Sequence, residues 1–75
     1  MTALEVVFRY TTPPRERQLR ALDGVREVYG IRRISFDSAA RTVRVEFDAS
    51  RLTAAVVAGL LRDAGLAITE RVQLA

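Results

Sequence analysis

The chemistry open to this chain is limited by the side chains it contains. Its 75 residues include no Cys and no His, which excludes thiolate nucleophiles, disulfides, imidazole acid–base catalysis and zinc sites of the finger type. The remaining reactive groups are carboxylates, hydroxyls and guanidiniums, and no two carboxylates have the spacing of an acid–base pair. We therefore expect a protein that is not an enzyme and that needs no cofactor.

One short segment combines positive charge with a stiff backbone. Pro13 and Pro14 precede Arg15 and Arg17, at a point where a helix is expected to begin. Free N–H groups and the positive end of the helix dipole meet there, so two guanidiniums could hold a phosphate or a carboxylate. The competing interpretation is a solvated helix start, because proline has no N–H to donate and Glu16 lies between the two arginines.

The other candidate groups favour structural roles. Asp37, Asp48 and Asp63 lack the D-x-D-x-D spacing of an oxygen-ligand site for Mg²⁺ or Ca²⁺, and Asp37 is placed to close a turn. Tyr10 and Tyr29 have no partner base in the chain, so we expect both to pack at the edge of the core.

Hydrophobic periodicity defines the elements that must position these groups. Alternating apolar residues indicate strands, and two apolar stripes at helical spacing indicate helices, the second with Thr53 as N-cap and Gly65 at its end. Gly24 interrupts the first helix, so either it packs closely against the sheet or the helix ends at Asp23. The expected elements are a strand at 4–10, a helix at 14–29, hairpin strands at 31–36 and 43–47 around the turn 37–41, a helix at 53–64 and a strand at 66–74.

The two faces of the sheet are predicted to differ in polarity. The apolar face, toward the helices, is expected to include Leu4, Val6, Phe8, Tyr10, Val43, Val45, Phe47, Leu66, Ile68, Val72 and Leu74. The open face is expected to carry Arg9, Arg33, Ser35, Arg44, Glu46, Thr69 and Arg71 as a solvated ladder of charges. Aromatic rings that could stack on bases are missing from it, so an RNA-binding sheet is not predicted.

The element order β-α-β-β-α-β predicts an α+β fold. Two right-handed βαβ crossovers that share one antiparallel sheet give the ferredoxin-like βαββαβ sandwich, with strand order 4-1-3-2 and both helices on one face. Length and composition fit a single domain over residues 1–75. The 12 basic residues are interspersed with 9 acidic ones, so no nucleic-acid partner is predicted. No apolar run reaches the roughly 18 residues of a membrane span, and the cytoplasm is the expected location.

Two adjacent runs carry a family resemblance. G-I-R-R-I-S-F at 30–36 and T-V-R-V-E-F-D at 42–48 are followed by Leu52, by an apolar helix and by Ala64-Gly65 at its end. This pattern resembles the heavy-metal-associated domains, which comprise small copper and zinc chaperones and the N-terminal modules of metal-transporting P-type ATPases. The resemblance covers nearly the whole chain and implies the same ferredoxin-like fold.

The metal site of that family is a G-M-x-C-x-x-C loop at the start of the first helix, where two thiolates hold Cu(I) or another soft ion. An ungapped count places its two Cys positions on Pro14 and Arg17 and its Met position on Thr12. Soft ions need thiolate, thioether or imidazole ligands. The resemblance therefore implies a degenerate member that binds no soft metal.

Family members meet their partners through the first helix and the loop before it. We therefore expect a non-catalytic interaction or regulatory module that binds a partner protein, or a second copy of itself. The expected contact residues are Thr12, Pro13, Pro14, Arg15 and Arg17. Two alternatives stay open: a metal-related protein that uses oxygen ligands or a partner's ligands, and a small-ligand or anion sensor.

Overall fold

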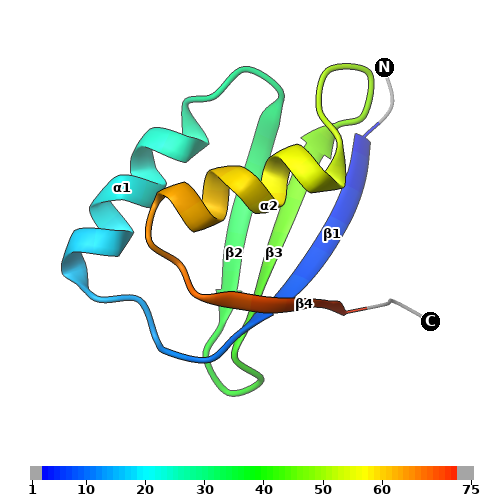
Figure 1. Ribbon diagram of the computed structural model, residues 1–75. Coiled ribbons are helices and arrows are strands. Elements are labelled where there is room, and N and C mark those ends of the chain that lie inside the picture. The colour runs from blue at the N-terminus through cyan, green and yellow to red at the C-terminus, as the bar shows by residue number, and fades with distance from the viewer. Residues whose placement is uncertain (1–2, 73–75) are drawn as a thin grey trace.

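The computed structural model describes residues 3–72, and Figure 1 shows one sheet with both helices over the same face. The strands are β1 (Ala3–Tyr10), β2 (Ile31–Asp37), β3 (Thr42–Asp48) and β4 (Ile68–Val72), and the helices are α1 (Glu16–Arg26) and α2 (Ala54–Asp63). Neighbouring strands are antiparallel in the order β2-β3-β1-β4, which is the predicted order 4-1-3-2 read from the other edge. The ferredoxin-like α+β fold is thus confirmed.

The core lies between the sheet and the two helices. Val43 and Val45 of the central strand β3 have no exposed surface, as the period-two alternation predicted. The helices contribute Leu22, Val25, Val57, Ala58 and Leu61. Fully burying one aliphatic side chain of this size contributes about 1.5–3 kcal/mol, so this single layer supplies much of the free energy that favours folding.

Helix α1 starts later than predicted and runs through Gly24 without a break. The expected helix over 14–29 begins only at Glu16, because the Gln18 side chain accepts a hydrogen bond from the Arg15 backbone N–H at 2.9 Å and sets the helix start there. No non-neighbouring side chain lies within 4 Å of the position that a Cβ on Gly24 would take. Neither close packing nor a helix end therefore accounts for this glycine.

The chain leaves α1 three residues earlier than predicted. The two backbone N–H groups after the helix bond back three residues, at 3.2 and 3.0 Å, and Gly30 then turns the chain with φ +105°. This turn takes Tyr29 out of the helix and leaves it 72% exposed, so the predicted packing of Tyr29 at the core edge is wrong. Tyr10 is buried in the core cluster, where its ring meets that of Phe36 edge-on.

Strand β4 contains an irregularity that reverses its last side chains. Its pairing with β1 shifts by one residue at Thr69, as in a β-bulge. Beyond the bulge, Arg71 lies opposite a core residue of β1, and Val72 lies opposite a residue of the open face. The predicted faces of Arg71 and Val72 are therefore wrong, because one extra residue inverts every later side chain. Leu74 lies outside the described residues.

The predicted caps and turns are confirmed. Thr53 accepts a hydrogen bond from a backbone N–H of α2 at 3.2 Å, and Asp37 closes the hairpin turn in the same way at 3.2 Å. Gly65 follows α2 with φ +93°, a conformation that favours glycine. Leu4 lies opposite Phe47 on the predicted core-facing side of the sheet, although it lines a hollow beside α2 and remains 51% exposed.

Candidate functional site

The candidate interaction site is the β1–α1 loop with the first turn of α1, residues 11–17. The Thr11 N–H donates to the Ala67 carbonyl at 3.2 Å, and the Arg41 Nη1 donates to the Thr11 carbonyl at 3.2 Å. These contacts come from the connection before β4 and from the β2–β3 turn, so two distant segments fix where the loop leaves the sheet. Pro13 and Pro14 restrict the backbone that follows.

The five predicted contact residues lie together on this loop and helix start. Thr12, Pro13, Arg15 and Arg17 are exposed, while Pro14 is half-buried. Arg15 precedes the first helical residue in an extended conformation, and Arg17 lies in the first turn. Four of the five predicted contact residues are therefore accessible to solvent.

The positive charges of Arg15 and Arg17 are not paired with the neighbouring acid Glu16. Glu16, which lies between them in sequence, pairs instead with Arg20 one helical turn later, at 2.6 Å. Neither Arg15 nor Arg17 forms an ion pair with any residue from 3 to 72. Arg41 brings a third guanidinium to the edge of the loop. The site is therefore positive, and the helix start adds a further preference for anionic groups.

Two neighbours of the loop were not predicted. Leu19 lies one turn beyond Arg15 on α1 and is 44% exposed. Its spacing from Arg15 is visible in the sequence and could have placed it on the same surface. Arg41 reaches the loop from the β2–β3 turn, with φ +53°, and only the pairing of the strands brings it there.

The open face of the sheet carries a solvated network of ion pairs. Arg9 pairs with Glu70 at 2.9 Å, and Arg44 pairs with Glu5 at 3.1 Å, both across neighbouring strands. Exposed pairs of this kind contribute about 0–1 kcal/mol each. The predicted ladder of arginine and glutamate across the strands of this face is thus confirmed.

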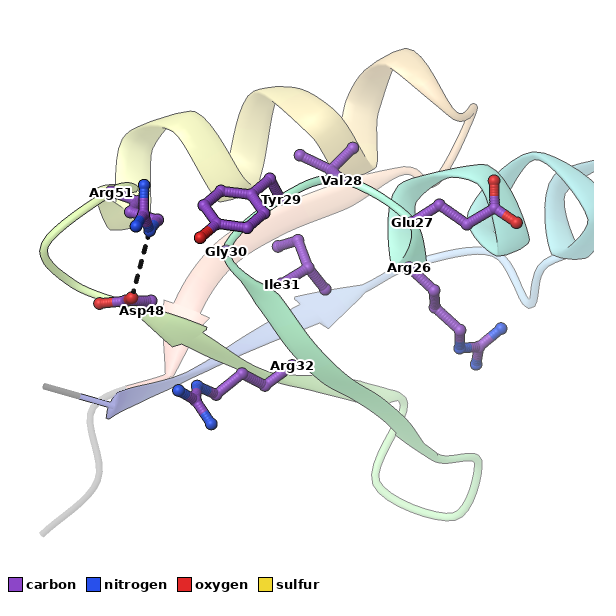
Figure 2. Close-up of a pocket in the computed structure, with 9 residues that line it drawn as sticks. All are labelled: Arg26, Glu27, Val28, Tyr29, Gly30, Ile31, Arg32, Asp48 and Arg51. Carbon is purple, nitrogen blue, oxygen red and sulfur yellow. Dashed lines mark ion pairs between the residues drawn. The ribbon is translucent and has the colours of Figure 1, made fainter. Parts of the chain in front are cut away.

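A second candidate site is the hollow of about 360 Å³ where α1 ends and β2 begins, called the Tyr29 hollow below. Figure 2 shows Tyr29, Arg51 and Asp48 gathered at one end and Arg26 at the other. The Arg51 guanidinium lies over the Tyr29 ring, 4.1 Å from its centroid. No pattern in the sequence linked these two residues.

Asp48 is the acidic group of this hollow, and it is held as a carboxylate. Its Oδ1 accepts hydrogen bonds from the Ser50 Oγ at 2.7 Å and from the Ser50 N–H at 3.0 Å. These bonds, helped by the nearby positive charges of Arg51 and Arg32, lower the pKa of Asp48, although burial opposes the shift. A carboxyl so stabilised in its charged form is a poor proton donor at neutral pH.

A metal site of the oxygen-ligand kind finds no support in the described part of the chain. Between residues 3 and 72, no three side chains of the types His, Cys, Asp and Glu gather closely enough to hold an ion. Asp37 and Asp48 instead accept hydrogen bonds in their own turns. The helices within the same residues are too short or too polar to span a bilayer.

Comparison with known proteins bears on the fold. No protein-family model matches the chain, and no curated protein matches it. Among solved structures, the yeast copper transporter domain Ccc2a, determined in solution in its apo and Cu(I)-loaded states, superposes with a TM-score of 0.66. The two chains are 16% identical over 88% of this chain and 94% of that domain. The chain thus shares the fold of that domain.

Proposed function

We propose that this chain is a non-catalytic interaction module that binds an acidic surface of a partner protein through the β1–α1 loop. The observation that carries the proposal concerns Arg15 and Arg17. Both are exposed and form no ion pair with a described residue, while the acid between them is paired with Arg20. Each guanidinium can donate two parallel hydrogen bonds to one carboxylate.

The loop also suits docking because it loses little freedom. Its first residue, Thr11, forms hydrogen bonds with Ala67 and Arg41 of two other segments, and two prolines follow it. A contact surface that is ordered before binding pays less entropy when a partner arrives. Leu19, exposed beside the arginines, offers an apolar contact next to the charged ones.

The copper-transporter domain that shares this fold was studied with Cu(I) bound, which raises the question of metal transfer here. This chain has no Cys and no His, and Pro14 and Arg17 occupy the positions at which the family resemblance places the two thiolates. We therefore propose that the β1–α1 loop keeps a docking role while the soft-metal ligands are gone. A role beside a metal transporter remains the second candidate, because the fold is shared.

The proposal is tested with a labelled peptide of alternating Glu and Ser as an acidic probe, measured by fluorescence anisotropy at rising salt. Replacing Arg15 and Arg17 by Ser removes the ion pair that each arginine would form with a Glu of the peptide. At about 0.5 kcal/mol for each exposed pair, the affinity for the peptide should fall about fivefold. Arg33→Ser with Arg62→Ser is the matched control, because it removes the same charge from exposed arginines elsewhere.

The control double variant should lower the affinity for the acidic peptide by less than about twofold, because only the net charge changes. Equal weakening by both double variants would show that the probe senses only overall charge, and the loop would not be the site. Sedimentation of the wild-type chain tests self-association separately, since a dimer through this positive surface would place like charges together.

A further inference from the structure

The Tyr29 hollow lies at the opposite end of α1 from the β1–α1 loop, and none of the loop residues lines it. Its volume of about 360 Å³ falls within the range of small-molecule sites. Val28 and Ile31, both half-buried, supply apolar surface, and arginines border it, as Figure 2 shows. The hollow therefore combines an apolar wall with cationic groups.

Arg51 is the best-placed cation of this hollow. Its guanidinium is held from one side by the Tyr29 ring at 4.1 Å and attracted by the Asp48 carboxylate, whose Oδ2 lies 3.6 Å from Nε. Its side-chain N–H groups donate no hydrogen bond to any residue from 3 to 72, and half of the side chain is exposed. Stacking thus orients the planar fork while leaving its donors free.

The negative charge of Asp48 does not prevent an anion from binding there. One of its oxygens is already engaged by Ser50, and its charge is balanced by Arg51 and Arg32. The lining residues carry three arginines against two carboxylates, which leaves a net charge of +1. An oxyanion would meet the outer edge of Arg51, on the side away from Asp48.

We propose that the Tyr29 hollow binds a small organic oxyanion, a carboxylate or a phosphate monoester, whose charged group takes the free N–H donors of Arg51 and whose apolar part lies against Val28 and Ile31. The apolar wall distinguishes such a ligand from an inorganic ion. Tyr29 acts by fixing the plane of the guanidinium, since a stacked arginine loses less freedom when it forms a bidentate contact.

The test is a ¹H–¹⁵N NMR titration of the chain with phenyl phosphate, benzoate and inorganic phosphate as separate probes. Saturable shifts should centre on the amides of Tyr29, Gly30 and Arg51, and one or both organic probes should bind more tightly than inorganic phosphate. The relative affinity for benzoate and phenyl phosphate identifies which oxyanion the site prefers. Equal affinity for inorganic and phenyl phosphate would overturn the role of the apolar wall.

Matched variants separate this site from general charge. Arg51→Gln should lower the affinity for the preferred organic probe at least about tenfold. Arg62→Gln removes the same charge from an exposed arginine of α2 and should change that affinity less than about twofold. Arg51→Lys keeps the charge but loses the planar fork, so it should also bind poorly. Equal affinity of the Arg51→Gln and Arg62→Gln variants would refute the proposal.

The Tyr29→Leu variant and the loop variant complete the set. Tyr29→Leu, at an exposed position, should leave the fold intact and weaken the probe several-fold by freeing Arg51. The double variant Arg15→Ser, Arg17→Ser should bind the organic probe as the wild type does. If it does not, the shifts report the β1–α1 loop, and the Tyr29 hollow is not the site.

Discussion

Replacing Gly24 by Ala should stabilise the protein. Gly24 lies in the interior of α1, its surroundings leave at least 4 Å of open space at the Cβ position, and its φ is not positive. A glycine in such a place costs about 0.5–1 kcal/mol relative to alanine, because the unfolded chain loses more freedom when it folds. For a domain of this size, that gain should raise the melting temperature by about 4 °C.

The matched control for Gly24→Ala is Gly30→Ala. Gly30 has φ +105°, and a Cβ there would lie 3.0 Å from the Leu52 Cδ1. Alanine at that position should therefore lower the melting temperature, by an energy of about 1–3 kcal/mol for the strained backbone. Thermal denaturation followed by circular dichroism measures both variants. A lower melting temperature for Gly24→Ala would refute the continuous helix through Gly24.

Three further outcomes are expected. Val45→Asp should lower the free energy of unfolding by several kcal/mol in urea denaturation, because it buries a charge, whereas Arg44→Asp should lower it by about 1 kcal/mol. Equal losses of stability would contradict a core on one side of the sheet only. Asp48→Asn should be less stable than the wild type at neutral pH, because a group with a lowered pKa stabilises the fold only while it is charged. The difference in unfolding free energy between the two proteins should shrink as the pH falls through the lowered pKa of Asp48. A difference that stays constant between about pH 7 and 3 would contradict this. In a Cu(I) competition assay, the wild type should show no tight binding and the double variant Pro14→Cys, Arg17→Cys should gain it. No gain of Cu(I) binding in the double variant would contradict the placement of the two Cys positions on Pro14 and Arg17.

The fold was predictable because its signals are local. Strict alternation in β3 specifies which side of the sheet is buried, and it does so within seven residues. Gly30 and Gly65 mark the two places where the chain turns with positive φ after a helix. Each of these signals depends on neighbours in sequence, so no knowledge of the tertiary structure is needed to interpret them.

The errors arise where partners distant in sequence decide the outcome. The bulge at Thr69 exists because β4 pairs with β1, and the sequence of β4 alone does not indicate it. The start of α1 is an exception, because the Gln18 side chain and the Arg15 N–H that set it are only three residues apart, and the two prolines favoured an earlier start. The pairing of Glu16 with Arg20 is local too, and its four-residue spacing was present in the sequence.

The Tyr29 hollow was beyond sequence reasoning for the same physical reason. Tyr29 and Arg51 belong to separate connections, and they meet because the Asp48 N–H donates to the Gly30 carbonyl at 2.7 Å and draws the two connections together. Glycine favours this arrangement, because the backbone has φ +105° and a Cβ would lie 3.0 Å from the Leu52 Cδ1. The glycine was recognisable as a helix end, but the site that it builds was not.

The two candidate sites are separable by distance. The β1–α1 loop and the Tyr29 hollow lie at opposite ends of α1, whose 11 residues span about 16 Å. This length is about twice the Debye length at physiological salt, so a charge removed at one site acts only weakly on the other. Substitutions that far apart and without shared partners add in free energy. Because of this separation, a loss of binding at one end of the helix can be assigned to the residues at that end.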